Sequence, residues 1–290
     1  ERFGEARLPR ITLSDTRRAA KRGERKGHIN KELHDLMQSA LESGRQVMLF
    51  QNRRGFAPYV ECEECGASVR CPMCSVTLSY HKSDNSLRCH HCGHRIPTPE
   101  VCPECGKGRL LPQGFGTEKI EEELARLFPE ALAARLDADV ATSPSRYGAI
   151  IEDFASGKSD ILVGTQMITK GFDFAGVSVV GVLNADNMLN SPDFRSSERA
   201  FQLLTQVAGR AGRREKEGVV VVQTSEVEHP VLGWVVRGDY DAMARSELSE
   251  RSAFGYPPYS HIIMFTLRCD NLQLLRRGAG WWSARMREKF

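Results

Sequence analysis

The 290-residue sequence has no apolar run of the roughly eighteen residues that a membrane-spanning helix requires. Its first residues, ERFGEARLPRITLSD, lack the apolar core of a signal peptide. We therefore expect a protein of the reducing cytoplasm, where disulfides are rare. The sequence also lacks an initiator Met, so we expect a fragment of a longer protein.

A strong net charge is missing as well. The formal charge is +3, and eight thiolates binding two divalent ions would change it by −4, to −1. The overall charge therefore gives no information about nucleic acid. Residues 17–31, RRAAKRGERKGHINK, are locally basic. We interpret them as a solvated, partly mobile segment, with a nucleic-acid contact as the alternative.

The apolar fraction of 41% with 27% charged residues is typical of a soluble globular protein. Residues 29–41 repeat apolar side chains at helical spacing and are followed by Gly44, a helix stop. QVMLF, residues 46–50, predicts a strand that is buried on both faces. Further strands are expected at 132–139, 160–165, 177–186 and 218–225, and further helices at 117–128, 145–157 and 196–209, with Thr117 and Ser196 or Ser197 as caps. This alternation predicts an α/β fold, with a mainly parallel sheet and helices on both faces.

The pattern changes near His229, where a helix-rich stretch begins, and GYPPY at 255–259 marks a break. Residues 260–270, SHIIMFTLRCD, predict a new strand. We expect it to belong to the beginning of a separate C-terminal α+β domain.

Eight of the nine Cys residues form four Cys-x-x-Cys pairs between residues 62 and 105. The pairs are Cys62/Cys65, Cys71/Cys74, Cys89/Cys92 and Cys102/Cys105. Two such pairs can complete a tetrahedral Cys₄ zinc site, and Gly directly after three of the pairs suits the tight turn. A redox dithiol needs one pair at a helix start in a βαβ unit, which four clustered pairs do not resemble. We therefore predict two structural zinc ions.

Four pairs can combine into two sites in three ways. Fourteen residues separate Cys74 from Cys89, which is close to a zinc-ribbon spacing. This favours a nested arrangement, in which Cys62, Cys65, Cys102 and Cys105 bind one ion and Cys71, Cys74, Cys89 and Cys92 bind the other. A sequential arrangement is the alternative, although only five residues separate Cys65 from Cys71. His81, His90, His91 and His94 are interpreted as non-ligands, and Cys269 as buried packing.

A second group of residues lies in DILVGTQMITKGFDF and QVAGRAGR. The first segment is a strand followed by a loop, and ligands of α/β sheets bind beyond such carboxyl ends. In the second segment, Arg210 and Arg213 are three residues apart, and Gly209 and Gly212 allow close approach of the backbone. Two guanidinium groups placed in this way suit the γ-phosphate of a nucleotide.

In this order, the two segments resemble motifs V and VI of superfamily 2 helicases, which lie on the second RecA-like lobe. With LFQNRRGFAP, LRCHHCG, GFGTEKIEEEL, SPDFRSSERAF, EHPVL, GYPPY and the four Cys pairs, the chain from about Leu8 to about Leu267 resembles the PriA family of primosomal replication-restart helicases. The resemblance implies an ATP-dependent 3′→5′ DNA helicase that uses ATP with Mg²⁺, acts at stalled forks and reloads the replicative helicase. It also supports the nested zinc arrangement.

The resemblance further implies roles for individual residues. Gln206, Arg210 and Arg213 would act in catalysis, Gly209, Gly212 and Asp173 would bind the nucleotide, and Thr165, Lys170 and Gly171 would contact DNA. Forked or single-stranded DNA, other primosome proteins and single-strand-binding protein are the expected partners. A monomer in the bacterial cytoplasm is expected.

The expected domains are a discontinuous RecA-like helicase lobe 2 at 8–57 and 113–228, a zinc-binding insertion at 58–112, and a helical connector with the start of a C-terminal domain at 229–290. The sequence GKS at 157–159 does not fit a Walker A motif, because that motif requires Gly where Glu152 stands. We therefore expect a surface turn there and no ATP hydrolysis by the chain alone. The competing hypothesis is a non-catalytic zinc-ribbon module, binding DNA or protein, on a degenerate RecA-like fold.

Overall fold

The computed structural model describes residues 9–51, 59–74, 76–81, 84–89, 92–112, 117–137, 140–169, 174–212, 218–265, 267, 269 and 271–289. The chain divides into two compact units, Glu1–Ser249 and Glu250–Phe290. No helix in the described ranges combines the length and apolar character needed to cross a membrane.

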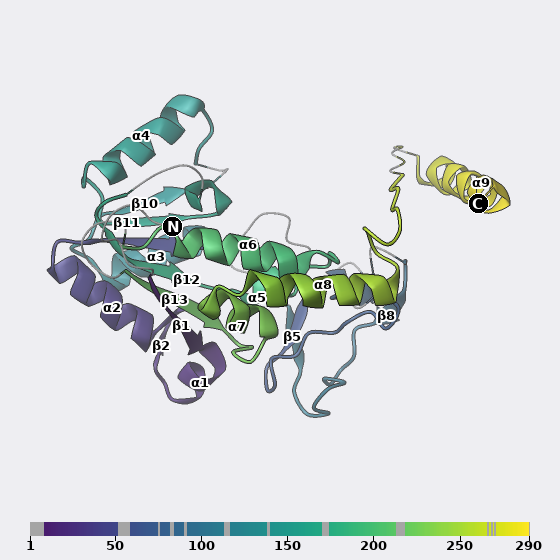
Figure 1. Ribbon diagram of the computed structural model, residues 1–290, viewed down its shortest axis with the longest axis horizontal. Coiled ribbons are helices and arrows are strands. Elements are labelled where there is room, and N and C mark those ends of the chain that lie inside the picture. Colours follow the sequence, from purple (N-terminus) through teal and green to yellow (C-terminus); the bar gives the residue numbers. More distant parts are fainter. Residues whose placement is uncertain are drawn as a thin grey trace. The chain divides into compact units, whose positions relative to one another are not determined.

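The first unit is built on a six-stranded sheet with strand order β1-β13-β12-β4-β11-β10, and every neighbouring pair in it is parallel (Figure 1). The strands are β1 (Arg10–Asp15), β4 (Gln46–Phe50), β10 (Ala133–Leu136), β11 (Ile161–Gly164), β12 (Val177–Val182) and β13 (Val219–Thr224). The parallel α/β sheet expected from the sequence is therefore confirmed. Strand β1, in which four of the six residues are polar or charged, was not among the strands that the sequence pattern predicted.

The central position of strand β4 explains the apolar run from Val47 to Phe50. Its side chains alternate between two hydrophobic cores, with Val47 and Leu49 in one and Met48 and Phe50 in the other. All five residues of the strand are buried. A central parallel strand that is covered on both faces has no solvent side to keep polar.

Helices cover both faces of this sheet (Figure 1). The helices of the first unit are α1 (Thr16–Lys21), α2 (Lys31–Glu42), α3 (Thr117–Leu127), α4 (Pro144–Ala155), α5 (Asp186–Leu189), α6 (Ser196–Ala208), α7 (Pro230–Arg237) and α8 (Tyr240–Phe254), the last of which runs into the second unit. Apolar side chains of α2 and α3 form the core on one face, and those of α4, α6 and α7 form the core on the other. The apolar faces of these amphipathic helices therefore pack against the sheet.

Two of the predicted caps differ from the structure. Helix α6 begins at Ser196 after Arg195, and no side chain caps it. Thr117 is the first helical residue of α3, and its hydroxyl donates a hydrogen bond to the Asp137 carboxylate. A buried hydroxyl needs a partner, and this carboxylate, just after β10, supplies one.

The Cys-rich segment separates β4 from α3 in the sequence and forms two small antiparallel sheets. Strands β5 (Val60–Cys62) and β9 (Leu110–Pro112) pair at its base, and β6 (Ser79–His81), β7 (Ser86–Arg88) and β8 (Arg95–Pro97) form a three-stranded sheet. We call residues 59–112 the zinc insertion. Its own core contains the Cys side chains and a few apolar residues, including Val60, Leu78 and Leu87.

The second unit contains the end of α8 and helix α9 (Leu272–Lys289). The strand predicted at 260–270 is wrong for the residues that are described there, which form no regular structure. Ile263 and Met264 are exposed, and Cys269, expected to be buried, is exposed too. A single strand is not stable without neighbouring strands, and the described part of this unit supplies none. The domain ranges expected from the sequence remain a prediction.

Candidate functional site

The structure brings the eight paired Cys residues together in two groups of four. One group contains Cys62, Cys65, Cys102 and Cys105, and the other contains Cys71, Cys74, Cys89 and Cys92. Within each group, all four sulfur atoms lie within 4.8 Å of one another. This is the nested grouping that the sequence favours, and the base strands β5 and β9 bring the two ends of the insertion together for it.

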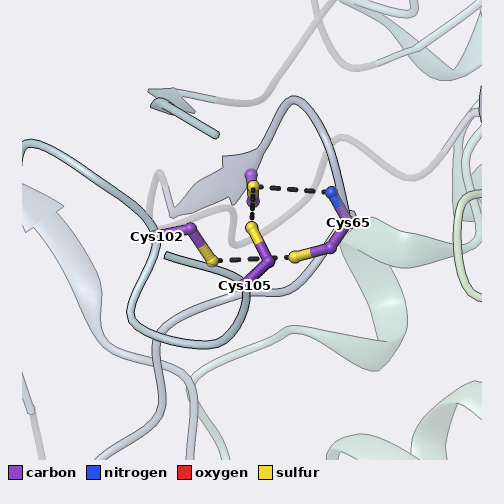
Figure 2. A group of neighbouring side chains, drawn as sticks. Cys65, Cys102 and Cys105 are labelled. Atoms are coloured by element: carbon purple, nitrogen blue, oxygen red, sulfur yellow. Dashed lines mark hydrogen bonds between the residues drawn. The ribbon is translucent and has the colours of Figure 1, made fainter. Parts of the chain in front are cut away.

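The sulfur distances fit a tetrahedral zinc ion. Four sulfurs at about 2.3 Å from one ion would lie about 3.8 Å from each other. The observed Sγ–Sγ distances are 3.7 Å for Cys62–Cys105, 3.6 Å for Cys65–Cys102 and 3.6 Å for Cys71–Cys92. In Figure 2 the sulfurs of Cys65 and Cys102 point toward each other, with Cys105 beside them.

The backbone of three of the four Cys-x-x-Cys turns fits this arrangement of sulfurs. Gly66, Gly93 and Gly106 each follow the second Cys of a pair and have φ angles of +73°, +76° and +67°. Each of these Gly amides donates a hydrogen bond to the carbonyl of the first Cys of its pair. The amide of Cys65 donates to Cys62 Sγ at 3.5 Å. An L-residue in this left-handed conformation would be strained, so Gly allows the turn to close around the sulfurs.

The electrostatics of the first group favour a bound cation. Backbone amides of Gly108 and Lys107 lower the pKa of the Cys105 thiol to about 6. In contrast, loss of hydration raises the pKa of Cys65 to about 12. Four thiolates in this small space repel one another, so a divalent cation is needed to deprotonate the whole set.

The described His residues of the insertion are not part of either group. His81 lies in β6, and His94 follows the Cys92 turn. Neither belongs to a group of potential ligands among the described residues. His90 and His91 lie outside these residues.

Lobe residues from three different segments hold the zinc insertion. Arg17, in α1, donates a hydrogen bond from Nη1 to the carbonyl of Cys65. Ser68 donates to Asn190 Oδ1 at 2.5 Å, and Asn190 in turn donates to Glu226 Oε1 at 3.2 Å. Asn190 is fully buried, so this polar link fixes the insertion on the lobe rather than leaving it free.

Two neighbouring carboxylates, the partly buried Glu61 and the buried Asp186, lie beside this link. Burial, together with the nearby carboxylate of Asp186, raises the pKa of Glu61 to about 8. Burial also raises the pKa of Asp186, which accepts hydrogen bonds from Thr224 and from the Ser225 amide. The sequence reasoning missed this pair and the Arg17 and Asn190 contacts, because no local pattern indicates them.

The second group of predicted residues, from the segments 160–174 and 206–213, lies around a short 3₁₀ helix, η2 (Gln166–Thr169), that follows β11. Thr165 is buried at the carboxyl end of β11. Arg210, just beyond the end of α6, donates a hydrogen bond from Nη2 to the carbonyl of Thr169. The two predicted motifs are therefore in direct contact.

The other predicted residues of this second group do not take part in the contact between Arg210 and Thr169. Gln206 is exposed on α6, and Gly209 is its C-cap residue. Gly212 has a φ of +65°, and its amide donates to the carbonyl of Val177 at 3.4 Å, at the amino end of β12. Lys170, Gly171, Asp173 and Arg213 lie outside the described residues.

The GKS sequence lies in the connection between α4 and β11, as expected. Gly157 has a φ of +78°, and Lys158 is exposed and paired with Asp153 at 2.7 Å. Ser159, by contrast, is buried. The segment precedes a strand and does not open a helix, so it has no phosphate-binding loop geometry.

Comparisons with known proteins find two families in this chain. The PriA DNA helicase Cys-rich region (CRR) domain matches residues 71–97, and the Helicase conserved C-terminal domain matches residues 116–215. The first match covers the second Cys group from Cys71 to Cys92. The second match contains η2, α6 and Arg210.

Curated relatives match most of the chain. Replication restart protein PriA of Bacillus subtilis is 40% identical over 260 residues, which is 90% of this chain and 32% of that protein. The PriA protein of Haemophilus influenzae is 45% identical over 80% of this chain and 32% of its own length. That of Synechocystis is 41% identical over 93% of this chain and 32% of its own length. The chain thus spans about one third of these relatives.

Proposed function

We propose that the chain is part of an ATP-dependent 3′→5′ DNA helicase of replication restart, because it matches PriA proteins over most of its own length and contains both matched domains. The observation that carries this proposal is the contact between Arg210, just after α6, and Thr169, in η2, within a unit built on a parallel sheet. This contact joins the segment after β11, which would contact DNA, to the end of α6, which would face the nucleotide. Coupling ATP hydrolysis to movement along DNA requires such a connection.

Some of the predicted site residues would act on the nucleotide, and others would contact DNA. Arg210 and Arg213 stabilise the charge that develops on the γ-phosphate, and Gln206 positions the reacting groups. Gly209 and Gly212 let the backbone approach the nucleotide and its Mg²⁺, and Asp173 supports the same site. Thr165, Lys170 and Gly171 contact DNA phosphates from the loop after β11. Most of the ATP site comes from another part of the whole protein.

The two zinc ions have a structural role. Their eight thiolates crosslink an insertion whose own core is small, so metal binding supplies much of its folding free energy. The insertion presents a surface to DNA or to other primosome proteins, and single-strand-binding protein is a further partner. The whole protein acts as a monomer in the bacterial cytoplasm.

The test uses the whole protein and measures DNA-stimulated ATP hydrolysis and unwinding of forked DNA with 3′ and 5′ tails. We expect unwinding from 3′ tails, and an Arg213→Ala variant with a kcat lower by on the order of 10³-fold. The 290-residue chain alone should hydrolyse almost no ATP. If Arg213→Ala kept full activity while Cys71→Ser abolished partner binding, the lobe would be a degenerate scaffold for a zinc-dependent binding module instead.

A further inference from the structure

The segment from Arg17 to Lys31 forms a basic surface at the carboxyl edge of the sheet. Its cations are Arg17, Arg18, Lys21, Arg22, Arg25, Lys26 and Lys31, and Glu24 is its one acidic residue. The segment directly follows β1, and in a parallel sheet all the strands end at the same edge. This is the edge where α/β sheets bind ligands, and it is also where Thr165 lies.

The backbone of this segment is held firmly. Asp15 caps α1 by accepting hydrogen bonds from the amides of Arg17 and Arg18, both at 2.9 Å. The amide and the Nδ1 atom of His28 contact the buried Glu123 carboxylate at 2.8 and 2.7 Å. Gln223, at the end of β13, donates to the carbonyl of His28 at 2.8 Å. The solvated, partly mobile segment expected from the sequence is therefore an ordered α1 helix and β2–β3 hairpin, with β2 at Arg25–Lys26 and β3 at Ile29–Asn30.

Some of the cations are used within the protein, and others are not. Lys31 pairs with Asp35, Lys26 Nζ contacts His34 at 3.1 Å, and Arg17 binds the Cys65 carbonyl. Arg18, Lys21 and Arg22 are exposed and form no ion pair with any residue that the structure describes. These side chains are therefore available to a ligand from outside.

A pocket of about 380 Å³ opens beside these side chains. Lys21, Arg25 and His28 line it. Glu61, Glu63 and Asp186 also line it, together with Cys62 of the zinc insertion. Glu63 is paired with Arg109 at 3.0 Å, and Asp186 is bonded to Thr224 and Ser225, so both carboxylates already have partners. Glu61 accepts a hydrogen bond from the Tyr59 hydroxyl at 3.4 Å, so each of the three carboxylates has a partner. The lining cations Lys21 and Arg25 come from α1 and β2.

We propose that Arg18, Lys21, Arg22 and Arg25 bind phosphate groups of DNA beside the zinc insertion. The inference rests on the proposed helicase function, which brings DNA to this edge. A protein partner fits less well, because protein interfaces have an apolar centre and no large apolar side chain is exposed within residues 9–51. Phosphate binding needs only cations on a fixed scaffold, and this surface has both.

The experiment compares two triple variants of the zinc-loaded chain. Lys21→Gln/Arg22→Gln/Arg25→Gln removes three charges from the basic surface. Arg45→Gln/Arg126→Gln/Lys158→Gln removes three charges near the amino ends of β4, β10 and β11, on the opposite edge of the same sheet. Fluorescence anisotropy with labelled forked DNA gives Kd at several salt concentrations. Circular dichroism and zinc content confirm that both variants are folded.

We expect the first variant to bind at least about tenfold more weakly at 0.1 M salt, and its plot of log K against log salt to be shallower by about two to three, since each phosphate contact contributes about 0.9. The control variant should keep most of the affinity and the slope. Equal losses in the two variants would overturn the phosphate site while leaving the helicase function standing. A parent chain that binds no DNA would overturn the inference, and a whole protein unable to unwind forks would overturn the proposed function itself.

Discussion

The guanidinium group of Arg210 donates a hydrogen bond to the backbone carbonyl of Thr169, so the end of α6 is tied to η2. Thr169 is buried, and its hydroxyl also donates to the carbonyl of Gln166 at 2.8 Å. The Arg210 side chain thus has a structural partner within the lobe. A γ-phosphate in the whole protein would compete with Thr169 for the same donors.

Because of this contact, we expect substitution of Arg210 to lower the stability of the chain even in the absence of ATP. Arg210→Ala leaves the buried Thr169 carbonyl without this donor, so the free energy of unfolding should fall by about 1–3 kcal/mol. Arg210→Lys, which can still donate one hydrogen bond, should lose less. Urea unfolding of the zinc-loaded chain measures both, with Arg126→Ala on the exposed side of α3 as the control. An unchanged midpoint for Arg210→Ala would show that the contact contributes nothing in solution.

The zinc grouping predicts a distinctive pattern among double variants. Cys62→Ser/Cys102→Ser removes two ligands from the same group, so one zinc per chain should remain. Cys62→Ser/Cys71→Ser removes one ligand from each group, so both ions should be lost or greatly weakened. Metal analysis of the purified chains gives the stoichiometry. A sequential arrangement would give the reverse result, which makes the two variants controls for each other.

The sequence allowed this grouping to be predicted because ligand spacing and turn Gly residues are local features. Strand β4 was likewise predictable, since burial on both faces leaves an apolar run in the sequence. The contact between Ser68 and Asn190 was not, because these residues are 122 positions apart and neither is unusual in its local sequence. The strand predicted at 260–270 failed for the opposite reason, because an apolar local pattern cannot supply neighbouring strands.

Gly23 and Gly27 both lie in the basic segment 17–31, and Ala substitutions at these two positions provide a matched comparison. Gly23 and Gly27 have φ angles of +66° and +61°, so an Ala at either position should cost about 1–2 kcal/mol in backbone strain. A Cβ at Gly23 would meet nothing within 4 Å, whereas at Gly27 it would lie 2.4 Å from Glu123 Oε2. The Glu123 carboxylate can move only by giving up its hydrogen bonds to His28.

Gly27→Ala should therefore lower the free energy of unfolding by about 1–3 kcal/mol more than Gly23→Ala. It should also weaken DNA binding more, because the β2–β3 hairpin carries Arg25. Urea unfolding and DNA anisotropy on the same samples measure the two effects. Similar losses for the two variants would mean that Glu123 does not hold the hairpin.

His229 predicts a dependence of stability on pH. Its Nδ1 atom accepts a hydrogen bond from the Val231 amide at the start of α7, which only the neutral ring can do. Burial lowers the pKa of His229 to about 4, and the positive charge of Arg70 adds to the effect. In the unfolded chain, the pKa returns to about 6.5. Between these two values the unfolded state binds more protons, so the free energy of unfolding falls as the pH falls from about 6.5 toward 4.

Between pH 7.5 and pH 5.5, this single group should remove about 1 kcal/mol of stability. His229→Asn keeps a side-chain acceptor for the Val231 amide and cannot titrate in this range, so it should lose correspondingly less. Urea unfolding of both chains at both pH values gives the difference, and effects of pH on the zinc thiolates are common to the two and cancel. If both chains lost the same stability, His229 would carry a proton in the folded state at pH 5.5, and its bond to α7 would have to be broken there.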